Sequence, residues 1–161
     1  MIHRILLGHD GSASADQAYR FAVDLALRYG AELHVLVVAR PPDFGDEVEA
    51  QAAIEDAQRR YHRVLSALKL RLANDGVDAQ AHLVVGHPAE QLVRHAEQHA
   101  VDHIVVGHRG HTLFERWLIG SVARQVVAYA PCAVTVVRQG DARARRAAAQ
   151  AGAAAAPKTC A

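Results

Sequence analysis

The sequence predicts a single-domain α/β fold, a five-stranded parallel open sheet with helices on both faces. Short apolar runs alternate along the chain with longer segments in which apolar residues recur at helical spacing. The length of 161 residues is enough for one core, and neither an internal repeat nor a second domain is visible. Polar and glycine-rich positions follow the ends of several apolar runs, where open parallel sheets bind their ligands.

The first half of the chain alternates two strands with two helices. Ile2–Gly8 is a nearly continuous apolar run, typical of a strand buried on both faces. Ala13–Tyr29 repeats apolar residues at helical spacing, and the glycine that follows is a natural helix end. Leu33–Ala39 is rich in β-branched residues and predicts the second strand. After a loop with two prolines, Val48–Asn74 carries a one-sided apolar stripe and predicts a long helix.

The second half repeats the alternation. Asp78–Val85 predicts the third strand, and Ala89–His99 predicts a helix whose first turn suits the preceding proline. Val101–Gly107 predicts the fourth strand. A loop then leads to a helix at Ser121–Tyr129, and a proline separates this helix from the fifth strand, Ala133–Arg138.

The last part of the chain differs in composition, being rich in alanine and arginine. Alanine favours helix, but this part has no apolar face large enough to dock on a core. We therefore predict a folded domain over residues 1–139 and a disordered tail over residues 140–161. The net charge is +1, and the tail carries three more positive than negative groups, so the domain is weakly acidic. Such a domain lacks the basic surface of a nucleic-acid-binding protein.

The composition also bears on the compartment. No apolar run approaches the roughly 18 residues that a membrane helix needs, so no membrane association is expected. The start of the chain lacks the long apolar stretch of a signal peptide. A cytoplasmic protein is expected, in which Cys132 and Cys160 are reduced thiols. Cys132 is predicted to be a small buried apolar residue.

The strongest functional signal lies in Asp102–Arg138, DHIVVGHRGHTLFERWLIGSVARQVVAYAPCAVTVVR. Gly107, Gly110, Gly120 and Ser121 follow the spacing G-x2-G-x9-G-S. Glycines let the backbone approach a ligand closely, and N–H groups of such a loop and of the next helix start form a cradle for phosphate. Ser121 adds a hydroxyl or caps that helix. The alternative is a loop that only needs turns.

This spacing, with Asp10 after the first strand, resembles the ATP-binding branch of the universal stress protein family over roughly residues 1–138. The resemblance implies a Rossmann-like fold of the adenine-nucleotide alpha hydrolase type, with strand order 3-2-1-4-5, and ATP with Mg²⁺ as the ligand. In that order Asp10 and Gly107 end neighbouring strands at the point where the order reverses, which is where open sheets bind ligands.

The nucleoside part of the ligand would lie against the first two strands. Asp10 is expected to accept hydrogen bonds from ribose hydroxyls, as acidic residues do in dinucleotide folds. A turn-forming or helix-capping aspartate is the alternative. The resemblance alone implies that the backbone of Val38 contacts adenine, and by position Gly8 and His9 should wall the same pocket.

The phosphates would lie against the glycine-rich loop and the helix after it. The resemblance implies contacts from Gly107 and Gly110, from the N–H groups of Arg109 and His111, and from Gly120, Ser121 and the N–H of Val122. The Arg109 side chain adds a charged contact, with a simple surface charge as the alternative.

The motifs of several nucleotide enzymes are missing. There is no GxxxxGK[ST], no GxGxxG after the first strand and no GxSxG. No clear general base is placed to activate water, so no catalytic residue is predicted. An ATP-binding stress-response switch is therefore favoured over two alternatives, a nucleotide-free dimeric interaction module of the same fold and a slow ATPase.

The resemblance also implies a homodimer formed through the last strand. Ala133–Val137 is apolar and would be an exposed edge strand, which invites pairing with a second copy. The alternatives are that the tail covers this edge or binds an unknown protein partner.

The eleven histidines are interpreted as polar residues of the surface and of strand ends. His9, His87, His108 and His111 all follow strand ends. His108 and His111 are hypothesised to contact phosphate or to make binding pH-dependent. His95 and His99 have the spacing of a helical metal pair. Because no HExxH motif or further ligand accompanies them, surface histidines and no metal site are predicted.

Overall fold

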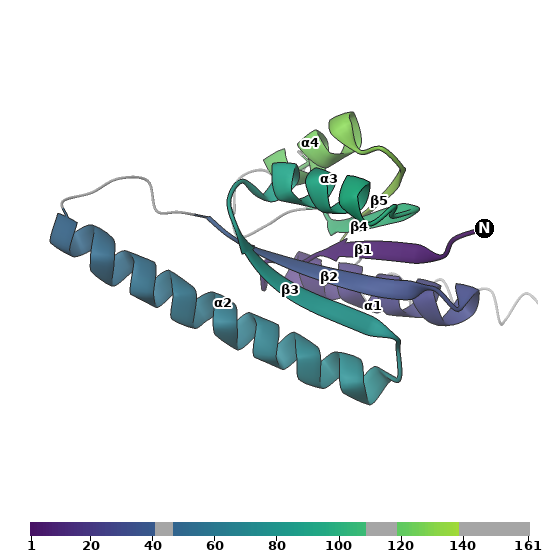
Figure 1. Ribbon diagram of the computed structural model, residues 1–161, viewed down its shortest axis with the longest axis horizontal. Helices are drawn as coiled ribbons and strands as arrows, with labels where there is room; N and C mark the ends of the chain where they lie inside the picture. The colour runs from purple at the N-terminus through teal and green to yellow at the C-terminus, as the bar shows by residue number, and fades with distance from the viewer. Residues whose placement is uncertain (41–46, 109–118, 139–161) are drawn as a thin grey trace, which may run out of the picture.

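The computed structural model describes residues 1–40, 47–108 and 119–138. There the chain forms a parallel sheet in the order β3-β2-β1-β4-β5 (Figure 1). The strands are β1 Arg4–Gly8, β2 Glu32–Ala39, β3 Ala79–Val85, β4 His103–Gly107 and β5 Ala133–Val137. The helices are α1 Ala13–Tyr29, α2 Glu47–Asp75, α3 Pro88–Gln98 and α4 Ser121–Tyr129. The predicted fold class and strand order are confirmed, and the predicted boundaries lie within two residues of those observed.

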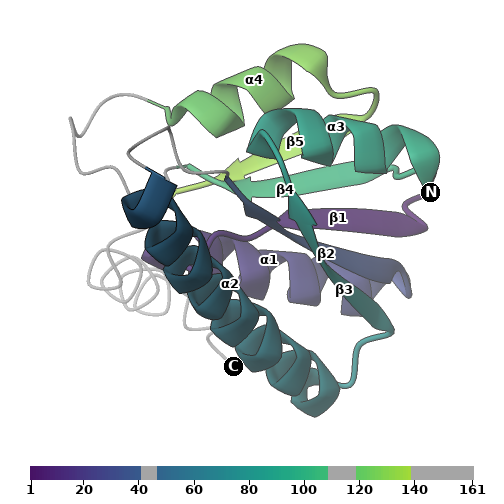
Figure 2. The ribbon, with the colours of Figure 1, turned by 60° about the vertical axis from the view of Figure 1, so that its left-hand side comes forward.

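The helices form two layers around the sheet. Figure 2 shows α1 and α2 on one face, and α3 and α4 on the other. Consecutive residues of a strand point to opposite faces, so the neighbours Leu6 and Leu7 of β1 enter different cores. Both side chains are fully buried. This explains why the central strands read as continuous apolar runs in the sequence.

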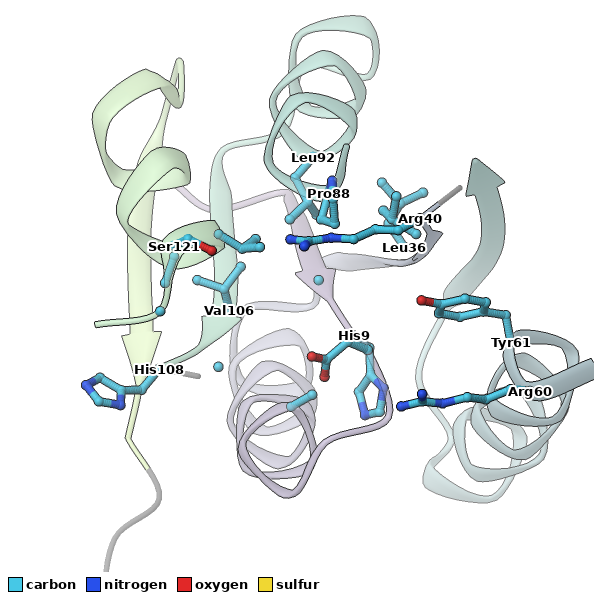
Figure 3. A pocket seen from close by; sticks show the side chains of 18 residues that line it. His9, Leu36, Arg40, Arg60, Tyr61, Pro88, Leu92, Val106, His108 and Ser121 are labelled. Atoms are coloured by element: carbon cyan, nitrogen blue, oxygen red, sulfur yellow. The ribbon is translucent and has the colours of Figure 1, made fainter. Parts of the chain in front are cut away.

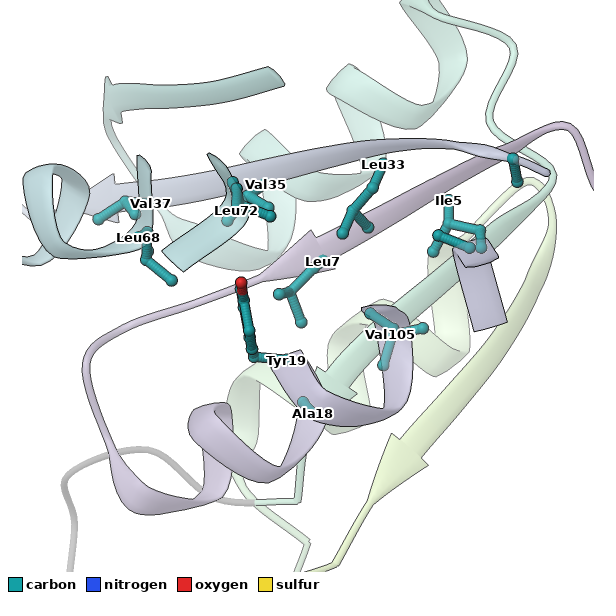
Figure 4. Packing of buried hydrophobic residues seen from close by; sticks show 13 residues of the cluster. Ile5, Leu7, Ala18, Tyr19, Leu33, Val35, Val37, Leu68, Leu72 and Val105 are labelled. Carbon is teal, nitrogen blue, oxygen red and sulfur yellow. The ribbon is translucent and has the colours of Figure 1, made fainter. Parts of the chain in front are cut away.

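The first core lies between the sheet and helices α1 and α2 (Figure 4). Its large buried members on β2 and α2 are aliphatic: Leu33, Val35, Val37, Leu68 and Leu72. Tyr19 of α1 belongs to this core, and its hydroxyl donates to Asp75 Oδ2 at the edge of the core at 2.6 Å. The Arg71 guanidinium lies 4.0 Å from the Tyr19 ring centre. Polar groups thus meet this core only at its edge.

The second core lies under α3 and α4, with Leu6, Leu36, Ile104, Leu92 and Val126 among its members. Two buried histidines accompany it, His34 of β2 and His95 of α3. The prediction of a surface histidine is therefore wrong for His95, whose exposed fraction is 9%. The reason is a partner far along the chain: His34 Nδ1 and His95 Nε2 are 2.9 Å apart, and a hydrogen-bonded polar group can be buried.

Several local predictions can be compared with the structure. Ser12 caps α1, since its Oγ accepts from the Ala15 N–H at 3.1 Å, and Gly30 ends that helix at φ +60°. Ser121 does not cap α4, because Gly120 is the N-cap and Ser121 is the first helical residue. Cys132 is only half-buried, since it precedes the edge strand β5. No helix in the described ranges is long and apolar enough to cross a membrane.

Candidate functional site

A pocket opens at the carboxyl ends of the strands, where the strand order reverses. Strand β1 pairs with β2 on one side and with β4 on the other. The chain leaves β1 for a helix on one face, while the helix after β4 packs on the other face. The pocket between them has a volume of about 330 Å³, within the range of small-molecule sites. Figure 3 shows Ser121 and His108 on one side of it, and Arg60 and Tyr61 on the other.

The turn after β1 forms the base of the pocket. The His9 N–H donates to the Leu36 carbonyl at 3.0 Å and so extends the pairing with β2. Asp10 Oδ1 accepts from the Ser12 N–H at 3.0 Å. Asp10 therefore does what the alternative interpretation predicts for a turn aspartate, and it also lines the pocket.

His9 is held as a neutral wall residue. Its Nδ1 accepts from the Gly11 N–H at 3.1 Å, which leaves the proton on Nε2, 3.4 Å from Asp16 Oδ1. Burial lowers the pKa of His9, and the nearby Asp16 carboxylate only partly opposes this shift. At neutral pH the imidazole thus contributes a dipole and no charge to the pocket.

Gly107 ends β4 where α1 approaches most closely. A Cβ on this residue would lie 2.8 Å from both the carbonyl carbon and Oγ of Ser14. Backbone atoms cannot move aside easily, so any other residue would force α1 away from the sheet. Gly8 differs, because a Cβ there would meet the flexible Leu92 side chain, with its Cδ1 at 2.9 Å. The glycine at 107 is thus required by helix packing, independently of any ligand.

The N-terminus of α4 opens into the pocket. The Gly120 N–H donates to the His108 carbonyl at 2.9 Å, which brings the helix start next to the end of β4. Ser121, Val122 and Ala123 then line the pocket with the first helical turn. N–H groups of a first turn have no carbonyl to bond within the helix and mark its positive end. No acidic residue lies in this turn, so the helix itself supplies no counter-charge.

Comparison with known proteins identifies the family that has this architecture. The model of the universal stress protein family matches residues 1–138. The chain belongs to the universal stress protein family. It is 31% identical over 153 residues to universal stress protein YxiE of Bacillus subtilis, covering 86% of this chain and 100% of that protein. A Thermus aquaticus universal stress protein is 36% identical over 140 residues, with 86% and 100% covered. Universal stress protein UspA from Lactobacillus plantarum has a TM-score of 0.77 at 27% identity, with 85% and 98% covered.

In this member of the universal stress protein family, the predicted site residues within the described ranges all line the one pocket: Gly8, His9, Asp10, Val38, Gly107, Gly120, Ser121 and Val122. The predicted residues Arg109, Gly110 and His111 lie outside the described residues. The contact of each residue with a nucleotide stays a prediction. Of the other strand-end histidines, His108 lines the pocket, whereas the exposed His87 at the N-cap of α3 is not part of its lining.

Sequence reasoning missed one side of the pocket. Arg40 follows β2, and Arg60 and Tyr61 come from α2. Figure 3 shows the Arg40 guanidinium reaching from the β2 side toward the middle of the pocket. Its position just after a strand end was a usable signal, because Asp10 and His108 in the lining share it. Tyr61 had no such signal, since in the sequence it is one more apolar position of the helix.

The same pocket has apolar walls. Leu36 and Val38 of β2, Leu92 of α3 and Val106 of β4 line it and are buried. Within the described residues, no group of three or more His, Cys, Asp or Glu side chains is arranged to hold a metal ion. In the described part of the chain, the pocket lining therefore combines apolar walls, one carboxylate, a helix N-terminus and two arginines.

Proposed function

We propose that this chain binds ATP in the pocket and acts as a cytoplasmic stress-response regulator whose nucleotide occupancy sets its state. The carrying observation is the positive N-terminus of α4, free of acidic residues in its first turn, which opens into a pocket with apolar walls. A helix start of this kind favours phosphate. Mg²⁺ accompanies the phosphates, because nucleotide phosphates rather than protein cages usually hold this ion.

The nucleoside is proposed to lie against the strands. Leu36, Val38 and Val106 offer an apolar surface for a flat base. Asp10 accepts hydrogen bonds from the ribose hydroxyls. A carboxylate can accept about four hydrogen bonds, so the turn contact to Ser12 and ribose binding are compatible. Arg40 and Arg60 add positive charge for the anionic ligand.

Structural neighbours support an adenine nucleotide as the ligand class. An Arabidopsis thaliana universal stress protein has AMP bound, at 15% identity and a TM-score of 0.66. A universal stress protein from Archaeoglobus fulgidus is in complex with dAMP, at 22% identity and a TM-score of 0.53. A third universal stress protein is in complex with cAMP, at 23% identity and a TM-score of 0.65. These ligands belong to those proteins, and the helix N-terminus of this chain is the reason for proposing a phosphate ligand here.

The test is a calorimetric titration of MgATP into the nucleotide-stripped protein, with released phosphate assayed afterwards. Ser121→Glu puts a carboxylate at the positive helix end, where it stabilises the helix but repels phosphate. We expect this variant to lose at least tenfold in affinity without losing stability. Ser66→Glu, an equal change at an exposed position of α2, is the matched control and should bind like the wild type.

Each outcome has a distinct meaning. Micromolar binding that is lost only in Ser121→Glu, without phosphate release, supports the nucleotide switch. Rapid phosphate release would show that the protein is an ATPase. A folded wild type that does not bind ATP, ADP or AMP would refute the proposal and leave the dimeric interaction module.

The homodimer is proposed to form through β5, which is an edge of the sheet within the described chain. Exposed edge strands pair readily, and lysine on an edge prevents this. Ala133→Lys, at the exposed start of β5, should therefore convert a dimer to a monomer in light scattering. Ala73→Lys, at an exposed position of α2, should leave the dimer intact. The domain over residues 1–139 would dimerise without the tail at residues 140–161.

A further inference from the structure

Four imidazoles from three elements meet where the last turns of α3 lie over the sheet. They are His34 of β2, His82 of β3, His95 of α3 and His99, the C-cap residue that follows α3, here called the histidine cluster. The ring centres of His95 and His99 are 4.0 Å apart, and those of His34 and His95 are 5.2 Å apart. His82 lies 5.8 Å from His95, between ring centres. His34 and His95 are buried, whereas His82 and His99 are exposed, so the cluster joins the core to solvent.

Hydrogen bonding orders the cluster. His99 Nδ1 lies 3.0 Å from the His95 carbonyl oxygen and therefore donates to it, since a carbonyl only accepts. Glu32 Oε1 lies 3.2 Å from His34 Nε2, although the buried nitrogen forms no aligned hydrogen bond. A carboxylate at this distance favours a proton on His34 Nε2. His34 Nδ1 is then the acceptor, and His95 Nε2–H donates to it at 2.9 Å.

This arrangement is built for neutral rings. One N–H joins the His34–His95 pair, so a proton added to His34 Nδ1 would set two N–H groups against each other, and protonation of both rings would place two cations in contact inside the protein. Burial lowers the pKa of His34, and it lowers the pKa of His95 to about 4, with His99 and His82 adding to the shift of His95. The Glu32 carboxylate acts in the opposite direction on His34.

Among the described residues, few charged groups lie around the pair. From β2 comes Glu32, from β3 His82, and from the C-cap of α3 His99. From β1 comes Arg4, whose Nε is 3.3 Å from Glu32 Oε2 and whose guanidinium donates to the His99 carbonyl at 2.8 Å. The Glu32 carboxylate is thus shared with Arg4, and its Oε1 also accepts from Gln80 Nε2 at 2.7 Å, so it cannot neutralise two protonated rings.

We propose that the histidine cluster is a proton-operated latch, which holds the last turns of α3 on the sheet while its buried rings are neutral and releases them when the rings are protonated. The proton is the ligand favoured here, because no described group is arranged to hold a metal ion. Release would be local, since α3 contributes Leu92 and Ala96 to the second core, whereas the first core has no part of α3.

The latch and the pocket are connected by α3, which carries residues of both. Pro88 and Leu92 of α3 line the pocket, and His95 follows on the next turn of the same 11-residue helix. Leu92 and His95 are three residues apart and lie on the same side of this helix, so a movement of the turn that carries His95 also displaces Leu92. Loosening of α3 at His95 therefore shifts a pocket wall, and this consequence rests on the proposed nucleotide function.

The direct test is a pH titration of the histidine ring nitrogens by NMR on the full chain with EDTA present. His34 and His95 should stay neutral well below pH 6, whereas a solvent-exposed histidine titrates near pH 6.5. Hydrogen exchange of α3 amides, corrected for the intrinsic pH effect, should accelerate as these two rings protonate, with α1 amides unchanged. Titration of His95 near pH 6.5, or exchange in α3 that ignores its protonation, would overturn the proposal.

Variants separate the latch from other acid effects. His95→Gln keeps a donor toward His34 but binds no proton. It should remove about 3–6 °C of the fall in Tm that the wild type shows between pH 7 and 4.5. His62→Gln, at an exposed position of α2, is the matched control and should keep that fall. An undiminished fall in His95→Gln would refute the latch, and if this variant does not fold, the wild-type ring titration decides.

A last measurement tests whether protonation of the histidine cluster affects ligand binding in the pocket. Acid should weaken MgATP binding in the wild type more than in His95→Gln, because His108 lines the pocket in both proteins and any direct effect of its protonation is common to them. Equal acid effects in the two proteins would remove the coupling to the pocket. If no nucleotide binds at any pH, the proposed function fails, while the ring titration and α3 exchange still decide the latch.

Discussion

The two faces of the sheet are packed in different ways. Under α1 and α2 the core is apolar apart from the Tyr19 hydroxyl, and Asp75 and Arg71, the charged groups that contact Tyr19, lie at the rim. Under α3 and α4 the core contains the buried His34–His95 pair and opens into the pocket. The first face is arranged for stability. The second contains a buried ionisable pair and borders the pocket to which nucleotide binding is assigned as a proposal.

The difference arises because side chains along one strand point alternately to the two faces of the sheet. Leu33 and Leu36 of β2 are both almost completely buried, but they point to opposite faces. Leu33 is surrounded by side chains, and Leu36 also forms part of the pocket lining. Burial alone therefore does not distinguish a structural leucine from one at a site.

The largest expected effect comes from this pair of leucines. Leu33→Ala should lower the free energy of unfolding by about 3–5 kcal/mol, because it leaves a closed cavity in the first core. Leu36→Ala should cost about 2–3 kcal/mol, because it only enlarges an existing pocket. Urea unfolding followed by circular dichroism measures both values. A larger loss in Leu36→Ala would contradict the division between the two faces.

The two strand-end glycines give the next effect. Gly107→Ala should cost about 1–3 kcal/mol, because its Cβ meets the Ser14 backbone on the first face. Gly8→Ala should cost less, about 1 kcal/mol, because Leu92 on the second face can change rotamer. The same unfolding measurements apply, and equal costs would show that the α1 backbone yields as easily as a leucine side chain.

Acid should act on the second face first. The pKa of His95 is about 4 in the folded chain and about 6.5 in an unfolded one. Between these values the unfolded chain binds more protons, so stability is lost as pH falls through this window. We expect a loss of about 2 kcal/mol between pH 7 and 4.5. Constant stability over this range would contradict a buried neutral pair.

The smallest effect should come from the rim of the first face. Asp16 Oδ1 accepts from Arg71 at 2.6 Å in a partly exposed ion pair. Burial raises the pKa of Asp16, but the hydrogen bond and charge of Arg71 outweigh it, and the net shift is downward. Asp16→Asn should therefore cost about 0.5–1 kcal/mol at pH 7. The difference from wild type should vanish as pH falls through the lowered pKa, whereas Asp24→Asn should show about half this effect or less, because its ion pair is more exposed.

Much of the fold could be predicted because its signals are local. The helical spacing of Ala13–Tyr29, the Ser12 cap and the Gly30 stop each depend on neighbours within about one turn. The alignment of Asp10 with Gly107 was also predictable, but it needed the strand order, which came from the family resemblance. The N-cap of α4 was missed because Gly120 and Ser121 are both acceptable there, and the bond from Gly120 to His108 decides between them.

By itself the sequence determined the fold class, the ends of the elements and the glycine-rich and strand-end residues that line part of the pocket. Only the tertiary structure decided that Gly107 must be glycine because Ser14 lies against it. It also decided that Arg60 and Tyr61 complete the pocket, and that His34 and His95 form a buried pair. The physical reason is that periodicity reports which face of an element is buried, while the partner on that face comes from a distant part of the chain.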